Sequence, residues 1–448
     1  MSNAELNETL YKLSSIAECA RGNKTFEFMS LAHLLNVGFL EDCYQNLDRN
    51  KAVGIDKVSW QEYGKDLAIN LKSLVVRLKN KSFKPMPARR VYIPKGNGET
   101  RPLGISTIEN KIVEGGVTRI LQSIYEEDFS DCSYGFRPLK NTHQALNDVD
   151  KKIMRQPVIF LVEADIKGFF DNVSHEKLID FLKIRVKDSS LIFLIKRFLK
   201  AGYIDNNLLV KSDKGTPQGS ILSPMLANIF LHYVLDTWFE HTVQRHMRGF
   251  CKLIRYADDF ICLAQYKKDA LNIERALANR FNKYELHLHP EKTRMFSFGR
   301  FEKQSALKAG RRANTFDFLG FTHFCDKTRK GHFKLGRKTS AKKFRAKCKD
   351  LNTWLKAIRN KVPTKEWWPI FQAKLRGHFE YYGVSGNFPS ISKFNSIAIR
   401  LLHKWLNRRS QKKKMSWSKL RVYLERHKLP TPSIKHNFYT LTHLGSYI

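Results

Sequence analysis

Two β-prone segments that end or turn at aspartate residues constrain the fold more than any other feature of the chain. Residues 158–164 form a β-prone run that ends at Asp165, and residues 252–264 form two such runs on either side of Asp258 and Asp259. The second pattern is typical of a hairpin with both acids at its tip. If the strand before Asp165 lies beside this hairpin, three carboxylates converge on one point.

The three aspartates also indicate a chemistry. Adjacent carboxylates repel each other, and a bound cation removes that cost. Such oxygen ligands suit Mg²⁺ shared with substrate phosphates, and two ions can activate a 3′-hydroxyl and stabilise a departing pyrophosphate. A lone aspartate at a strand end is more often a turn or cap residue, so the hypothesis depends on Asp165 together with the Asp258-Asp259 pair.

The charge of the chain indicates a polyanionic partner. Its 79 Lys and Arg residues against 42 acids give a formal net charge of +37, and a hydrophobic content of 42% can supply a large core. Nucleic acid is the partner expected from this balance. No apolar run approaches the roughly 20 residues that span a bilayer, and no signal peptide is visible, so we expect no membrane partner and a cytoplasmic location. The seven cysteines include no Cys-x-x-Cys pair, which predicts reduced thiols and no structural zinc.

More than half of the excess charge lies in the last quarter of the chain. Residues 337–448 hold 26 Lys and Arg residues and four acids, an excess of 22. Aromatic and aliphatic residues recur there at helical spacing, for example at Trp367, Phe371 and Leu375. This pattern predicts a helical domain with a basic outer face. A merely solvated basic surface is the alternative, but the size of the excess favours contact with nucleic acid.

The first 336 residues have a different pattern. Residues 1–50 are expected to be mostly helical, and from residue 91 to residue 324 short β-prone runs alternate with helical segments, which is an α+β pattern. The Lys-, Gly- and Ser-rich stretch 331–340 is expected to be a domain boundary.

Five segments resemble sequence motifs of reverse transcriptases, and they occur in the order found in that family. In chain order they are Tyr134–Pro138, Asp165 with Phe170 (Asp-x4-Phe/Tyr), Gly215–Asn228 (with the Pro-Gln-Gly block), Tyr256–Asp259 (the Tyr-x-Asp-Asp box) and Phe318–Phe321.

The flanking sequence is similar to that of group II intron-encoded reverse transcriptases of the bacterial type. Lys51–Trp60 resembles their Gly-x-Asp block, and Leu375–Gly383 and Leu402–Ser410 resemble their thumb or maturase domain. His378 stands where some relatives have Trp. The resemblance implies a right-hand polymerase fold of class α+β, followed by an all-helical domain. Its parts are an N-terminal extension over 1–50, fingers and palm with an antiparallel sheet over 51–330, and the thumb or maturase domain X with a basic tail over 331–448.

The resemblance also assigns site residues. It implies that Asp165, Asp258 and Asp259 are the catalytic carboxylates and that, together with Ile166, they hold two Mg²⁺ ions. The ring of Phe170 would lie under the ribose C2′ and favour dNTPs over ribonucleotides. The implied nucleotide-binding set is Arg89, Lys95, Arg101, Phe170, Gln218 and Lys292, and the implied primer–template set is Phe318, Leu319 and Gly320. The cations expected to bind RNA are Arg376, Lys404, Arg408, Arg409, Lys412, Lys413 and Lys414.

Residues 89–104 also predict a hairpin on their own pattern, with Gly-Asn-Gly at its tip. Such a turn would bring Lys95 and Arg101 near each other, and paired cations can neutralise a triphosphate. Exposed hairpin cations are usually only solvated, and the match to the family's fingers block favours the nucleotide role.

We therefore predict an RNA-directed DNA polymerase that uses an RNA template, a DNA or RNA primer and dNTPs. It would also bind group II intron RNA and assist splicing and retrohoming, in the bacterial cytoplasm. The alternatives are an RNA-binding splicing factor with a vestigial polymerase site and a domesticated relative in DNA repair or phage defence. No zinc-ligand or histidine-nuclease pattern follows residue 430, and acids are sparse after residue 336, so we expect neither an endonuclease nor an RNase H domain.

Overall fold

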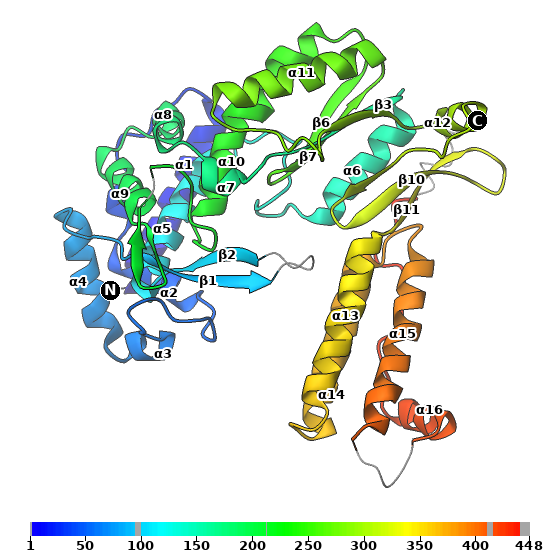
Figure 1. Ribbon diagram of the computed structural model, residues 1–448. Coiled ribbons are helices and arrows are strands. Elements are labelled where there is room, and N and C mark those ends of the chain that lie inside the picture. The colour runs from blue at the N-terminus through cyan, green and yellow to red at the C-terminus, as the bar shows by residue number, and fades with distance from the viewer. Residues whose placement is uncertain (1, 95–99, 212, 410–414, 440–448) are drawn as a thin grey trace. The chain divides into compact units, whose positions relative to one another are not determined.

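A computed structural model describes residues 2–94, 100–211, 213–409 and 415–439 of the chain (Figure 1). The chain divides into two compact units. Unit 1 consists of Met1–Thr142, Val162–Cys262 and Lys268–Met295, and unit 2 consists of His143–Leu161, Leu263–Lys267 and Phe296–Ile448. Among the described residues, no helix combines the length and the apolar character needed to cross a membrane.

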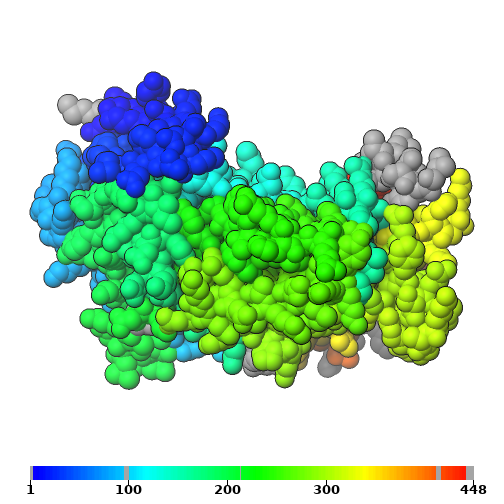
Figure 2. All heavy atoms as spheres, turned by 90° about the horizontal axis from the view of Figure 1, so that it is seen from above, coloured from blue at the N-terminus to red at the C-terminus, as the bar shows by residue number. Residues whose placement is uncertain are grey.

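The N-terminal part of unit 1 is a group of helices around α5 (Ile108–Tyr125). This helix begins at the N-cap Thr107, whose hydroxyl accepts the Asn110 N–H, and it packs against α1 and α2. In Figure 2 the N-terminal residues, drawn in dark blue, lie on the surface of unit 1. The expectation that residues 1–50 are mostly helical is confirmed. The other elements of this group are α1 (Ser2–Gly22), η1 (Ala32–Leu34), α2 (Val37–Gln45), α3 (Trp60–Tyr63), η2 (Gly64–Asp66) and α4 (Leu67–Lys79).

The predicted hairpin over residues 89–104 is present in a four-stranded sheet with the order β2-β1-β4-β5. Strands β1 (Ala88–Pro94) and β2 (Thr100–Ile105) pair antiparallel, with Ile93 opposite Arg101. A second hairpin, β4 (Tyr203–Asp205) and β5 (Leu208–Val210), joins it through a parallel pairing of β4 with β1. The tip, residues 95–99, lies outside the described residues.

A second four-stranded sheet has the order β6-β7-β3-β8. The expected hairpin consists of β6 (Cys251–Tyr256) and β7 (Asp259–Ala264), and β3 (Phe160–Asp165) is the neighbour of β7. The prediction that the strand before Asp165 lies beside the hairpin is therefore confirmed. The last strand is β8 (Arg294–Ser297).

The remaining helices of unit 1 follow β3 and the two hairpins along the chain. The apolar run expected to be helical from Ile221 to Leu235 forms α10 (Ser223–Leu231), which continues into π-helical turns. Such turns are rare and occur frequently at functional sites. The elements are α7 (Phe169–Asn172), α8 (His175–Arg185), α9 (Ser189–Lys200), α10, the π-helical η3 (His232–Asp236) and η4 (Phe239–Val243), η5 (Gln244–His246) and α11 (Lys267–Lys283).

Unit 2 combines a three-stranded sheet of order β11-β10-β9 with a helical C-terminal part. Helices α13 and α15 lie side by side (Figure 1), and Trp367, Phe371 and Leu375 of α14 are buried. The helical tail is thus confirmed. The elements are α6 (Thr142–Arg155), α12 (Glu302–Lys308), β9 (Thr315–Phe318), β10 (Phe321–Lys327), β11 (Phe333–Thr339), α13 (Ala341–Ile358), α14 (Thr364–Tyr382), α15 (Phe388–Asn407) and α16 (Trp417–Arg426).

The stretch 331–340, expected to be a boundary, is instead mostly strand β11. It pairs with β10 from Phe333 to Thr339, and its Leu335 and Arg337 are buried, so the segment belongs to a core although its composition resembles a linker. The region after residue 330 therefore begins with a strand before its helices. Unit 2 also starts earlier, at residue 296, and includes residues 143–161. The division into fingers, palm and thumb stays a prediction.

Candidate active site

The three predicted catalytic carboxylates lie at the ends of neighbouring strands. Asp165 is the last residue of β3, Asp259 is the first residue of β7, and Asp258 lies in the turn between β6 and β7. Asp165 is close enough to Asp258 for its charge to raise the pKa of that carboxyl. The next residue along from Asp165, Ile166, is buried and forms a bridge with Leu288.

The turn that carries Asp258 has an unusual backbone. Ala257 adopts a φ of 57°, and this left-handed conformation costs a non-glycine residue about 1 kcal/mol or more. Residues 132–135 run alongside, because the Arg255 N–H donates to the Cys132 carbonyl at 2.8 Å and the Tyr134 N–H donates to the Arg255 carbonyl at 2.9 Å. At Gly135 an added Cβ would lie 2.3 Å from the Ala257 nitrogen. The Tyr134–Pro138 block, one of the five motif segments, thus packs directly on the turn.

The local electrostatics favour an added positive charge. Burial, followed by the negative charge of Asp165, raises the pKa of Asp258, and the charges of Arg101 and Arg255 oppose that rise. Lys292 Nζ lies 2.5 Å from Asp165 Oδ2. Lys292 was expected beside a triphosphate, and here it already compensates one of the carboxylates.

A divalent cation fits this arrangement. The carboxylates of Asp165 and Asp258, of which the first raises the pKa of the second by its charge, are oxygen donors of the type that Mg²⁺ prefers, and Mg²⁺ usually takes only one or two carboxylates together with substrate phosphates. Among the described residues, no group of three or more His, Cys, Asp or Glu side chains is arranged so that it could hold a metal ion, so the expected convergence of Asp165, Asp258 and Asp259 into one such group is not observed. The remaining ligands would therefore have to come from substrate, water or the main chain.

The loop before α10 is attached to two predicted nucleotide-binding elements. The Thr216 N–H donates to the Phe170 carbonyl at 2.7 Å, and the Gly104 N–H of β2 donates to the Gln218 carbonyl at 2.6 Å. Phe170 is half-buried and forms an edge contact with Phe169. Phe170 and Gln218 are thus linked through one loop.

The predicted cations of the β1–β2 hairpin differ in their surroundings. Arg101 is exposed on β2, and its charge acts on Asp258. Arg89 is half-buried, and its guanidinium donates to the Val53 carbonyl at 2.8 Å through Nη2 and at 3.3 Å through Nε. The Nε and Nη2 donors of Arg89 are therefore already hydrogen-bonded within the protein. Lys95 lies outside the described residues.

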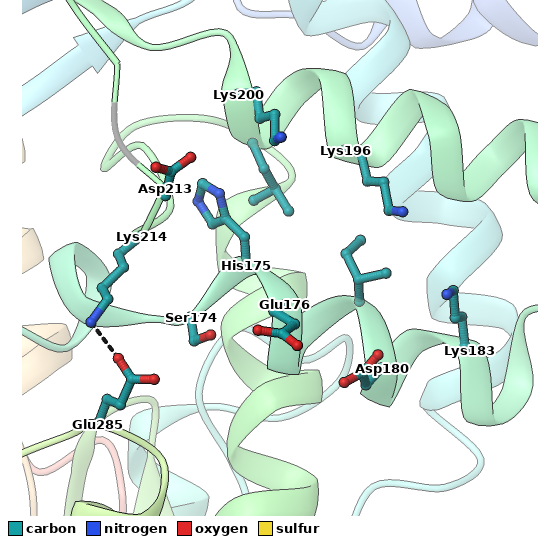
Figure 3. Close-up of a pocket in the computed structure, with 12 residues that line it drawn as sticks. Ser174, His175, Glu176, Asp180, Lys183, Lys196, Lys200, Asp213, Lys214 and Glu285 are labelled. Atoms are coloured by element: carbon teal, nitrogen blue, oxygen red, sulfur yellow. Dashed lines mark hydrogen bonds and ion pairs between the residues drawn. The ribbon is translucent and has the colours of Figure 1, made fainter.

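A pocket of about 530 Å³ lies beside α8 and does not coincide with the candidate active site. In Figure 3 Lys200 and Asp213 lie near the imidazole of His175, and Lys214 forms an ion pair with Glu285. His175 Nε2 donates to the Gly215 carbonyl at 2.6 Å, in the loop that holds Phe170. The charged lining is balanced, with lysines Lys183, Lys196, Lys200 and Lys214 against acids Glu176, Asp180, Asp213 and Glu285. The pocket therefore selects no class of ligand by its charge.

In unit 2, the predicted primer segment forms the turn between β9 and β10. Phe318 is buried, whereas Leu319 and Gly320 are partly exposed with φ values of 50° and 81°. The Tyr381 hydroxyl donates to the Leu319 carbonyl at 3.0 Å. Any contact of this segment with a primer would therefore come from Leu319 and Gly320 and not from the Phe318 ring.

The predicted RNA-binding cations of unit 2 are exposed where the structure describes them. Arg376 lies on α14, Lys404 lies on α15, and Arg408 and Arg409 follow it. Lys404 and Arg408 lie over the Trp405 ring, at 5.1 and 5.4 Å from its centroid. The cations Lys412, Lys413 and Lys414 lie outside the described residues.

The sequence reasoning missed two buried charged residues next to the turn. Arg255 precedes the Tyr-x-Asp-Asp box by one position, and Asp236 ends a run of apolar residues; both are fully buried and paired with each other. The available signal was a charged residue inside an otherwise apolar element, because such residues are almost never fully buried unless they are paired.

Sequence comparisons show the family to which the chain is related. The family described as reverse transcriptase (RNA-dependent DNA polymerase) matches residues 93–323, slightly more than half of the chain. The chain is similar to the "Group II intron-encoded protein LtrA" of Lactococcus lactis subsp. cremoris, with 38% identity over 229 residues that make up 51% of this chain and 38% of LtrA.

Two further relatives are "Protein YkfC" of Escherichia coli (strain K12) and the "Uncharacterized 91 kDa protein in cob intron" of Schizosaccharomyces pombe. The first is 32% identical over 243 residues, 48% of this chain and 64% of YkfC. The second is 39% identical over 171 residues, 38% of this chain and 21% of that protein. The predicted resemblance to group II intron-encoded proteins is confirmed by these matches, and this chain spans less than two thirds of the length of each relative.

Proposed function

Because the chain belongs to the reverse transcriptase (RNA-dependent DNA polymerase) family, we propose that it copies an RNA template into DNA by adding dNTPs to a primer 3′-hydroxyl. The observation that carries this proposal is the position of Asp165 beside the Asp258-Asp259 turn, on neighbouring strands of one sheet. A purely structural fold gains nothing from holding repelling carboxylates together.

In this mechanism Asp165, Asp258 and Asp259, with the main chain of Ile166, would hold the metal. When bound there, two Mg²⁺ ions would activate the 3′-hydroxyl and would stabilise charge on the departing pyrophosphate. Arg101, with Lys95 and the remaining donors of Arg89, would bind the triphosphate. Lys292 balances the charge of Asp165 and is a candidate general acid for the leaving group.

Selection of the nucleotide would depend on the loop before α10. Phe170 would lie under the ribose C2′ and disfavour a 2′-hydroxyl, and Gln218 would contact the base or sugar. The hydrogen bond from the Thr216 N–H to the Phe170 carbonyl supports a joint role, because it ties the backbone of Phe170 to the loop.

The same chain would bind structured RNA through unit 2. The exposed cations Arg376, Lys404, Arg408 and Arg409 supply a basic surface, and A-form RNA is recognised mainly through its backbone and shape. Lys412, Lys413 and Lys414 would add to this binding. A role with group II intron RNA in splicing and retrohoming, in the cytoplasm of a bacterium, is part of the proposal, since the similar protein LtrA is encoded by such an intron.

Primer extension tests the polymerase proposal. We expect extension on an RNA template with dNTPs and Mg²⁺, and we expect Asp258→Ala to abolish it because the variant lacks a metal ligand. Asp66→Ala, which removes an exposed carboxylate at the end of η2, should extend like the wild type. Equal extension by wild type and Asp258→Ala would refute the site. Absence of extension by a folded wild type that still binds RNA would instead support a splicing factor with a vestigial site.

A further inference from the structure

A fully buried ion pair lies next to the β6–β7 turn that carries Asp258. Arg255 on β6 and Asp236 in the π-helical turn η3 each have no exposed side-chain surface. Their pairing is bidentate, with Arg255 Nε 2.7 Å from Asp236 Oδ1 and Nη2 2.5 Å from Oδ2. Burying two charges is costly, and apolar side chains of similar volume are often equally stabilising or better. Stability alone therefore gives this pair no clear advantage over an apolar contact.

The remaining donors of the guanidinium reach the turn itself. Arg255 Nη1 donates to the Ala257 carbonyl at 2.9 Å and to Asn228 Oδ1 at 3.0 Å. Ala257 holds the left-handed conformation and immediately precedes Asp258. The bond to its carbonyl consequently restrains the peptide plane that leads to the Asp258 backbone.

Asn228 extends this restraint to the other side of the turn. Its Nδ2 donates to the Gly135 carbonyl at 2.8 Å, and Gly135 packs against the Ala257 nitrogen. Arg255 and Asn228 thus connect α10, the 132–135 segment and the catalytic turn in one buried network. An arginine fork can satisfy these acceptors together, which a lysine ammonium cannot do with the same geometry.

We propose that Arg255 is a positioning residue for the polymerase reaction: oriented by Asp236 and Asn228, it holds the Ala257 carbonyl and so fixes the place of Asp258 relative to Asp165. The inference rests on the proposed function, because the position of Asp258 matters for catalysis only if that carboxylate binds the metal. Arg255 itself touches neither substrate nor metal.

The test removes the pair without leaving a lone buried charge. In the double variant Arg255→Met with Asp236→Leu, we expect kcat to fall about 10- to 100-fold and the Mg²⁺ concentration for half-maximal extension to rise by a similar factor, as for other residues that orient metal ligands. The KM for dNTP should change by less than about twofold, because the nucleotide contacts are untouched.

An equally buried pair provides the matched control. Arg337 and Asp150 in unit 2 are also fully buried and paired, and Arg337→Met with Asp150→Leu removes the same chemistry within the other compact unit. We expect this control to alter thermal stability but not the Mg²⁺ dependence. Wild-type Mg²⁺ dependence in the folded Arg255 double variant, or an equal shift in the control, would overturn the proposal.

Arg255→Lys keeps the charge beside Asp236 and guards against a double variant that does not fold. We expect it to fold, to raise the Mg²⁺ requirement, and to speed backbone hydrogen exchange at residues 256–259. The exchange measurement needs no catalytic activity, so it separates the two claims. If the wild type extends no primer, the proposed function fails; if exchange at 256–259 and the Mg²⁺ requirement are unchanged in Arg255→Lys, the positioning role fails.

Discussion

At the scale of single residues, the imidazole of His378 occupies an unfavourable place for a charge. It is 6% exposed and stacks on the Phe394 ring at 3.6 Å between centroids, and neither ring nitrogen has a hydrogen-bond partner among the described residues. Burial therefore lowers its pKa from 6.5 to about 4. Between these two values the unfolded chain binds a proton that the folded protein does not, so the free energy of unfolding should fall as the pH drops from 6.5 towards 4.

We predict that His378→Phe removes this part of the pH dependence. Phe keeps the stacking and cannot be protonated. Between pH 7 and pH 4, the free energy of unfolding should therefore decrease in the variant by up to about 3 kcal/mol less than in the wild type. Urea unfolding followed by tryptophan fluorescence measures this, since five of the seven Trp residues lie after residue 350. His241→Gln, which changes an exposed histidine, is the control. Parallel loss of stability in His378→Phe and wild type would contradict the prediction.

Single residues also show what the sequence could and could not predict. The positions of Asp165, Asp258 and Asp259 at strand ends were predictable, because the strand pattern depends on near neighbours in sequence. Two hydrogen-bonded pairs were not predictable, namely Arg89 with the Val53 carbonyl and Arg255 with Asp236. A sequence does not say which distant acceptor an arginine side chain will bind. The same holds for the burial of the Phe318 ring, which depends on tertiary packing.

At the scale of elements, the Tyr134–Pro138 segment packs against the β6–β7 turn and restrains its backbone. We predict that Gly135→Ala lowers the free energy of unfolding by about 1–3 kcal/mol, because the new methyl group would meet the Ala257 nitrogen. It should also reduce primer extension by about tenfold or more, because displacement of the turn misplaces Asp258. Thermal melts and single-turnover extension measure the two effects.

A helical glycine offers the matched comparison. Gly377 lies within α14, and an added Cβ would have no heavy atom within 4 Å. Gly377→Ala should therefore raise the free energy of unfolding by about 0.5–1 kcal/mol and leave extension unchanged. A Gly135→Ala variant as stable and active as Gly377→Ala would show that the Tyr134–Pro138 segment does not restrain the β6–β7 turn.

Some helices and strands could be predicted from local sequence pattern, and others could not. The β1–β2 and β6–β7 hairpins and the helices of the tail were predictable, because alternation and helical spacing are local signals. Strand β11 was not predictable, because its Lys- and Gly-rich composition resembles that of a linker and its pairing with β10 depends on tertiary structure. The π-helical turns after α10 were also missed, since the apolar run there fits an α-helix equally well while the observed turns bring Asp236 to Arg255.

At the scale of the whole molecule, the net charge of +37 is unevenly distributed, as the positions of the charged residues in the sequence already indicated. The excess of 22 after residue 336 lies in a segment with buried Trp367 and Leu402, so most of the cations that the structure describes there belong to a folded surface. A folded cationic surface fixes the spacing of its charges. It should therefore displace counterions from an RNA backbone at defined places.

We predict that replacing Arg376, Lys404 and Arg408 together by Gln weakens binding to an RNA hairpin with a long A-form stem. The slope of log Kd against log salt should fall by about 2, since each lost phosphate contact removes roughly 0.7 to 0.9. Binding measured between about 50 and 200 mM salt gives this slope. The control replaces Lys267, Lys268 and Lys283, exposed on α11, and removes the same formal charge. If the control flattens the slope as much, RNA responds to net charge in general, and the assignment of its contact surface to the C-terminal helices is wrong.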